Sequence, residues 1–231
     1  MNVRGGRQVM AALVALAFVG GVPSMARAEP FTITAVLTGD IRMENPDNII
    51  INVTITGDTT SNQTSWVIDI NSPAHPNINL GGFFFNLGVD PTALSFHSFT
   101  PSAWSISVST SPAQGSGGAR FEFRANDPPG SGNNVTNSMN LTFTSQLASG
   151  TWNPLMFFNA PLSDGDAISD PGAQLGAHVR SLSTAGCSTC NTDSGFAFGN
   201  YDGSTTSVPE PGSLMLVGLG LAGFAFARRR R

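Results

Sequence analysis

The chain has two cysteines, Cys187 and Cys190, with two residues between them. This C-x-x-C spacing occurs in redox motifs, in zinc sites and in short disulfide loops. A redox motif needs a strand-to-helix setting, and a zinc site needs two further ligands, whereas only His178 is at all close in sequence. In an oxidising compartment the spacing favours a disulfide that fixes a local turn. Free thiols and a metal or redox site are the alternatives.

Three carboxylates occur within one short segment, at Asp164, Asp166 and Asp170. Calcium prefers oxygen ligands supplied by such loops. The spacing departs from the EF-hand pattern, because the third acid is misplaced and no bidentate glutamate closes the loop. These residues are the calcium candidates of the chain, and the alternative is a solvated acidic loop. We expect no other metal and no cofactor.

The chain shows no recognisable catalytic pattern. Its histidines, His75, His97 and His178, are scattered and form no H-E-x-x-H motif. No G-x-S-x-G nucleophile elbow is present. Two of the four glutamates, Glu29 and Glu210, stand near the ends, which leaves few partners for the paired carboxylates of a glycosidase. The sequence therefore predicts no enzyme and no catalytic residue, with a secreted hydrolase as the alternative.

Tryptophan rings can stack on sugars, and the chain has three of them. Trp66 and Trp104 alternate with other apolar residues, so we expect both in the core. Trp152 stands between Gly150 and Pro154 in a turn-like stretch. We therefore predict an exposed Trp152 and take it as the candidate sugar contact.

The elements that position these residues are predicted to be strands. Apolar and polar residues alternate with a period of two, which is typical of half-buried strands, in residues 31–37, 49–55, 66–70, 104–108, 121–123 and 139–143. Turn signals such as Gly57-Asp58 separate these segments. The pattern predicts an all-β fold, an antiparallel β-sandwich of roughly eight to ten strands of the jelly-roll kind, over residues 29–203.

One segment adds a resemblance to this fold class. Gly81 to Pro91, followed by Leu94-Ser95-Phe96, predicts a strand, a turn and the start of another strand. It resembles the place in cohesin-type sandwiches where a strand runs into an Asp-Pro turn and then a Leu-x-Phe. The resemblance implies a cohesin-like sandwich and carries no function.

Charge excludes one class of partner. Between Glu29 and Ser207 the chain has fourteen acidic residues against four arginines, a net charge of −10, and the whole chain has no lysine. Nucleic-acid binding needs a basic patch or stripe, and anionic lipid surfaces attract basic segments. We therefore expect no nucleic-acid partner.

Residues 1–28 have the three parts of a secretory signal peptide. Arg4 and Arg7 precede an apolar run from Val9 to Val19, and Ala26-Arg27-Ala28 is an A-x-A cleavage site. Eleven apolar residues make about 16 Å of helix, too short to span a membrane. We predict cleavage after Ala28 by signal peptidase, and hence export.

The other end of the chain divides into a linker, residues 204–212, and a short apolar helix with a basic tail, residues 213–231. The linker contains Val208-Pro209-Glu210-Pro211, where the two prolines keep the backbone extended. The apolar run from Leu214 to Ala227 makes about 21 Å of helix, short of a typical bilayer core. The closing arginines, Arg228, Arg229, Arg230 and Arg231, can reach the interface and hold this end on the cytoplasmic side.

This order of motif, apolar span and arginine cluster resembles the PEP-CTERM sorting signal of Gram-negative bacteria. The resemblance covers about the last 24 residues. It implies recognition by an exosortase, a membrane-embedded cysteine transpeptidase that cleaves near the motif, and a precursor held transiently in the inner membrane. It also implies release to the cell surface or beyond, in company with exopolysaccharide and biofilm.

Together these features predict an exported surface or matrix protein with a structural or adhesive role in exopolysaccharide. A carbohydrate-binding module of the same fold is the alternative.

Overall fold

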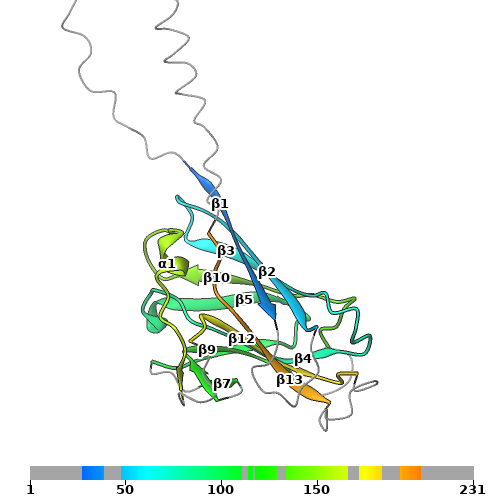
Figure 1. Cartoon of the computed structure of the whole chain (residues 1–231). Coiled ribbons are helices and arrows are strands. Elements are labelled where there is room, and N and C mark those ends of the chain that lie inside the picture. The colour runs from blue at the N-terminus through cyan, green and yellow to red at the C-terminus, as the bar shows by residue number, and fades with distance from the viewer. Residues whose placement is uncertain are drawn as a thin grey trace, which may run out of the picture.

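The computed structural model describes residues 28–38, 48–110, 114–116, 118–129, 134–165, 172–183 and 193–203. These residues form mostly antiparallel β-structure, so the predicted fold class is confirmed (Figure 1). The predicted signal peptide and the C-terminal apolar helix lie outside the described residues.

The main sheet has ten strands in the order β5-β10-β3-β2-β1-β13-β12-β4-β9-β6. Their bounds are β1 Pro30–Thr38, β2 Ile50–Asp58, β3 Gln63–Ile70, β4 Asn79–Phe85, β5 Leu94–Thr100, β6 Ser105–Val108, β9 Phe123–Asn126, β10 Leu141–Leu147, β12 Leu175–Arg180 and β13 Ser194–Gly199. The edge strands β5 and β6 follow one another in the chain, and the sheet is nearly barrel-shaped. The two layers expected of a sandwich therefore belong to one continuous sheet here, because β1 pairs with both β2 and β13.

The core lies between the two halves of this curled sheet. Alternate residues of β1 and β2 point inward, as their periodicity predicted. Aromatic rings from β4 and from the neighbouring strand β10 meet at Trp66, whose centroid lies 4.9 Å from that of Phe85 and 5.2 Å from that of Phe143. The indole Nε1 donates to the Ser145 hydroxyl at 3.0 Å, so the one polar atom of the ring is satisfied inside the core.

A small sheet covers part of the outer side of β4 and β13. It consists of β7 Gln114–Ser116, β8 Ala119–Phe121 and β11 Asp164–Gly165, in the order β11-β8-β7. Beneath it lies a second apolar cluster formed by Phe84, Ala119, Phe121, Ala173 and Phe198. The outer face of β12, β4 and β9 next to this cluster carries polar side chains.

The predicted turn before β5 is confirmed as a local structure. A short 3-10 helix, η1 Pro91–Ala93, joins β4 to β5 through residues 86–90. The Asp90 carboxylate accepts a hydrogen bond from the Thr92 amide at 2.9 Å and caps this turn. The hydrogen bond from the Thr92 hydroxyl, at 2.7 Å, and that from its amide hold the pKa of Asp90 below its ordinary value.

A buried glutamine fixes α1 Leu155–Phe158, the α-helix found among the described residues. The Gln174 amide nitrogen donates to the carbonyl oxygens of Phe157, Phe158 and Ala160 at 3.3, 3.2 and 2.9 Å. Its carbonyl oxygen accepts from the Tyr201 amide at 3.0 Å. One side chain therefore closes the end of α1 and holds the last described residues.

The described chain begins and ends at the same end of the domain. Thr34 in β1 exchanges two backbone hydrogen bonds with Asp202, at 2.7 and 3.5 Å. β1 itself starts at Pro30, two residues beyond the predicted cleavage site at Ala28. In Figure 1, β1 begins at the top of the view, and β4 and β13 lie near the bottom.

Candidate functional site

The candidate site lies on the outer face of β12, β4 and β9, where a β-bulge interrupts the pairing. His178 pairs with Gly82 while Val179 pairs with Leu80, so Gly81 is the extra residue of β4. A Cβ atom on Gly81 would lie 2.8 Å from both Arg180 Nε and His178 Nδ1. The missing side chain therefore lets these two side chains lie flat across the strand.

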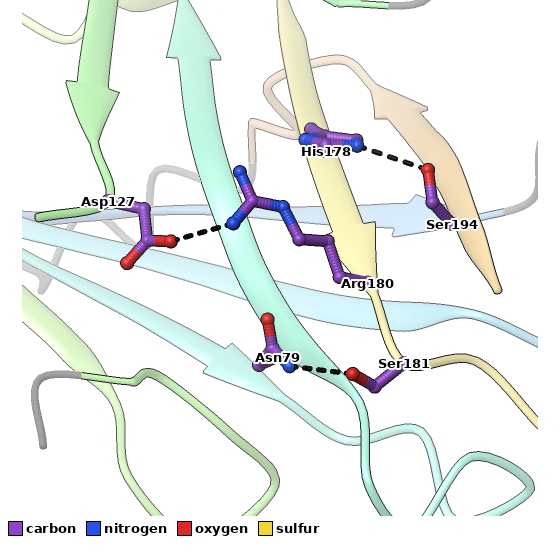
Figure 2. A network of polar contacts seen from close by, with 6 residues as sticks. All are labelled: Asn79, Asp127, His178, Arg180, Ser181 and Ser194. Carbon is purple, nitrogen blue, oxygen red and sulfur yellow. Dashed lines mark hydrogen bonds and ion pairs between the residues drawn. The ribbon is translucent and has the colours of Figure 1, made fainter. Parts of the chain in front are cut away.

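An ion pair crosses β4 at this bulge. Arg180 ends β12 and Asp127 follows β9, and β4 lies between these strands. Arg180 Nη1 donates to Asp127 Oδ2 at 3.1 Å, as Figure 2 shows. The Arg180 side chain is 48% exposed and that of Asp127 is 15% exposed. The pair therefore fixes one edge of the guanidinium on the sheet while the rest of the group faces solvent.

Burial controls the protonation of this acid. It raises the pKa of the Asp127 carboxyl above its ordinary value, and the Arg180 charge and hydrogen bond oppose the shift. Asp127 Oδ1 is buried and has no hydrogen-bond partner within the described chain. Arg180 therefore has a carboxylate partner that is itself poorly solvated.

An aromatic pair lies beside the ion pair. The rings of His178 and Phe196, which are opposite one another on β12 and β13, stack with centroids 4.9 Å apart and planes at 26°. His178 Nε2 and Ser194 Oγ are 3.2 Å apart (Figure 2). The stack gives the face one flat apolar surface among polar groups.

Neutral polar side chains complete the face. Asn79 Nδ2 donates to Ser181 Oγ at 3.1 Å (Figure 2), and Asn126 Nδ2 donates to Ser107 Oγ. Ser181 adopts φ of +59°, a left-handed conformation that is costly for a non-glycine residue and is common at functional sites. The arrangement therefore offers amides, hydroxyls, a guanidinium and a ring stack on one side of the sheet, which suits the binding of a polar ligand.

A second arginine extends this face toward the small sheet. The Arg124 guanidinium carbon lies 5.4 Å from the centroid of the buried Phe84 ring. This geometry is a cation–π contact. Its Nε is buried without a hydrogen-bond partner in the described part of the chain. The face therefore carries two arginines, held by different means.

The expectation that Trp152 is exposed is wrong. Its side chain is 1% exposed, its Nε1 donates to the Asn62 carbonyl at 2.9 Å, and its ring stacks on Phe157 at 5.3 Å. The stretch around Trp152 packs between the β2–β3 turn and α1, so the ring fills the core there and cannot stack on a sugar. Trp66 and Trp104 are also buried, as predicted.

The remaining predicted residues are either apart or outside the described chain. His75, His97 and His178 lie in a loop, in β5 and in β12, and do not meet. Asp164 lies in β11 opposite Arg120, and no group of three metal-binding side chains occurs among the described residues. Outside those residues lie the calcium candidates Asp166 and Asp170, the cysteines Cys187 and Cys190, and the sorting residues 208–211 and 228–231.

Sequence reasoning missed the residues of the outer face. The adjacent glycines Gly81 and Gly82 inside a predicted strand were a usable signal for the bulge. Nothing in the sequence could pair Asp127 with Arg180, which are 53 positions apart. Their contact depends on which strands flank β4.

The comparison with known families decides the nature of the C-terminal segment. Residues 207–231 match the PEP-CTERM protein-sorting motif. The chain carries a PEP-CTERM sorting signal. It is therefore an exported protein sorted by an exosortase, made as a membrane-anchored precursor in a Gram-negative bacterium.

No curated protein and no solved structure matches the chain at a significant level. The cohesin-like resemblance of residues 81–96 is therefore not confirmed. Within the described ranges, no helix has the length and apolar character to cross a membrane.

Proposed function

We propose that this PEP-CTERM protein is a non-enzymatic component of the extracellular matrix, with a structural or adhesive role at the cell surface. The observation that carries the proposal is the sorting motif at residues 207–231, which follows a described domain of mostly antiparallel β-structure. Processing by signal peptidase after Ala28 and by an exosortase near the motif would release the domain.

The shape of the domain supports this role. The last described residue is Gly203, next to Asp202, which bonds to Thr34 of β1, and Ser194 lies nine residues earlier in the sequence. At about 3.3 Å per extended residue, the network around Ser194 and Arg180 lies up to about 30 Å from Gly203. A precursor held by its tail would present this network away from the membrane, toward the matrix.

Deletion of the motif tests the sorting half of the proposal. We expect removal of Pro209 to Pro211 to trap an unprocessed precursor in the inner membrane, measured by fractionation and blotting. Deletion of Ser204 to Thr206, which has the same length and precedes the matched segment, is the control and should be processed normally. Equal processing of the two deletions would contradict the assignment.

A gene deletion tests the matrix half. We expect the deletion strain to form a matrix that releases more polysaccharide into the medium, and expression of the intact chain to restore retention. The motif deletion should fail to restore it. An unchanged matrix in the deletion strain would argue against a structural or adhesive role.

One contact keeps a hydrolase as the second candidate. Ser194 Oγ and His178 Nε2, at 3.2 Å, are within the range of a nucleophile and its base. Against this, the imidazole is stacked on Phe196, and the nearby Asp127 pairs with Arg180. Labelling of Ser194 by a fluorophosphonate probe would favour the hydrolase, whereas an inert chain is expected from the matrix role.

A further inference from the structure

We propose that the outer face of β12, β4 and β9 binds the carboxylate groups of an acidic polysaccharide, with Arg180 as the main contact. This inference rests on the proposed matrix function and names the chemistry of the partner. It uses the face built around the Gly81 bulge, which no similarity to another protein assigns.

The distribution of positive charge points to this face. The chain has no lysine, and the described residues contain three arginines, Arg120, Arg124 and Arg180. Two of them, Arg124 and Arg180, lie on the outer face of β9 and β12. Arg120 is exposed on β8, where its neighbours Ala119 and Phe121 point down into the second apolar cluster. An anionic ligand of the described surface therefore meets fixed positive charge mainly on this face.

The geometry of Arg180 suits a carboxylate. Within the described chain its guanidinium makes one hydrogen bond, from Nη1 to Asp127, and the side chain is 48% exposed. A guanidinium has five N–H donors in a planar fork that matches a carboxylate with two parallel bonds. Asp127 occupies Nη1 at one edge of this fork and leaves the other donors without a partner in the described chain.

The neighbouring groups suit sugar hydroxyls. Asn79, Ser181 and Ser194 lie around Arg180 in Figure 2, and the His178–Phe196 stack adds a flat ring surface. Amides and hydroxyls placed beside a ring are the polar contacts that orient a small polar ligand. The strained φ of Ser181 lies in the same network. A hydroxyl-rich chain with carboxylates fits this mixture.

A protein partner fits the face less well. Protein interfaces depend on a few buried aromatic or aliphatic anchors. The large apolar residues that the described surface exposes are Val36, Val108, Met139, Leu155 and Leu162. None of them belongs to β12, β4, β9 or β13. We therefore commit to a polysaccharide and make an acidic polypeptide an outcome of the test.

Binding to three polymers tests the ligand class. The exported, processed protein is titrated in calcium-free buffer with alginate, a chain of uronic acids, with neutral dextran, and with poly-glutamate. We expect alginate to bind at least tenfold more tightly than either of the others, which corresponds to about 1.4 kcal/mol. No binding of alginate, or equal binding of dextran, overturns the carboxylate contact. Equal binding of poly-glutamate overturns the polysaccharide.

Substitutions of the two residues of the ion pair test the site, because their expected effects on the affinity for alginate have opposite signs. Arg180→Gln should weaken alginate binding about tenfold. Asp127→Asn should strengthen it severalfold, because it removes the carboxylate that competes for the guanidinium. The double variant Arg180→Gln/Asp127→Asn keeps the net charge and leaves no buried acid without its partner, and it should be as weak as Arg180→Gln. A purely structural ion pair would not give this gain for Asp127→Asn.

Arg120→Gln is the matched control, because it removes the same charge from the exposed side of β8, outside the face of β12, β4 and β9. It should change alginate binding by less than about twofold. Equal losses in Arg120→Gln and Arg180→Gln would mean that net charge, and not this face, sets the affinity. If Arg180→Gln leaves binding intact while the protein still retains the matrix, the inference fails and the proposed function stands. If the gene deletion leaves the matrix unchanged, the proposed function fails regardless of the result of the alginate titration.

Discussion

Replacement of Gln174 tests whether one buried amide joins α1 to the segment around Tyr201 that follows β13. In Gln174→Met the volume is nearly kept, but the Ala160 carbonyl and the Tyr201 amide lose their bonds of 2.9 and 3.0 Å. Each buried group left without a partner costs about 1–3 kcal/mol, so these two bonds give a loss of about 2–6 kcal/mol. That is a large share of the roughly 5–15 kcal/mol that keeps a domain folded.

Urea unfolding of residues 29–207, followed by fluorescence of the buried tryptophans, measures the change. Gln63→Met is the control, because Gln63 is exposed and bonds another glutamine, Gln146, at 3.2 Å. It should cost less than about 0.5 kcal/mol. A loss below about 1 kcal/mol for Gln174→Met would refute the reasoning.

Gln174→Glu adds a test in which the stability of the variant depends on pH in a defined direction. The new carboxylate would face three carbonyl oxygens in the core, so its folded pKa is raised above the unfolded value. Stability of this variant is therefore highest below the unfolded pKa and is lost as the pH rises through the folded one. We expect Gln174→Glu to approach the wild-type midpoint near pH 4 and to fall well below it at pH 7. A pH-independent deficit would mean that the site is open to water.

Three further predictions concern single contacts, each measured by urea midpoints. Ser145→Ala removes the nearer acceptor of Trp66 Nε1 and should cost about 1–2 kcal/mol, whereas the exposed Ser65→Ala should cost almost nothing. Gly199→Ala should cost about 1–3 kcal/mol, because its Cβ would lie 2.6 Å from a backbone carbonyl of β1; a neutral effect would mean that β1 and β13 can separate. Burial raises the pKa of Glu122, so this acid stabilises the fold at low pH and loses that contribution as the pH rises through its folded pKa. Glu122→Gln should therefore be more stable than the wild type at pH 7 and equal to it near pH 4, and a constant difference would contradict the assignment.

The strands were predictable because burial of one face of a strand makes apolar and polar residues alternate along the sequence. The outward and inward residues of β1 alternate without a break, and the sequence shows the same alternation. β4 is different, since it is buried on both faces and Phe83, Phe84 and Phe85 follow one another. Its strand character was still predictable from the flanking Asp90-Pro91 turn.

The outer face was not predictable, because it depends on strand order. Arg180 and Asp127 become neighbours when β12 and β9 flank β4, and local sequence does not encode that order. The prediction of an exposed Trp152 failed for a related reason. Gly150 and Pro154 correctly indicate a turn, but the turn lies on the Asn62 backbone, and the ring is drawn into the core. Turn chemistry predicts the path of the backbone and does not predict which side chains remain exposed.

The position of β1 between β2 and β13 constrains the order of events during secretion. Among the described strands the first, β1, pairs with the last, β13, so this sheet is complete only after Gly199 has been translocated. Pairings of such wide sequence separation form late and slowly. The sorting motif begins only eight residues after Gly199. Completion of the domain and arrival of its sorting signal at the membrane are therefore nearly simultaneous. Retention of that signal in the membrane would allow time for β13 to pair with β1 and β12.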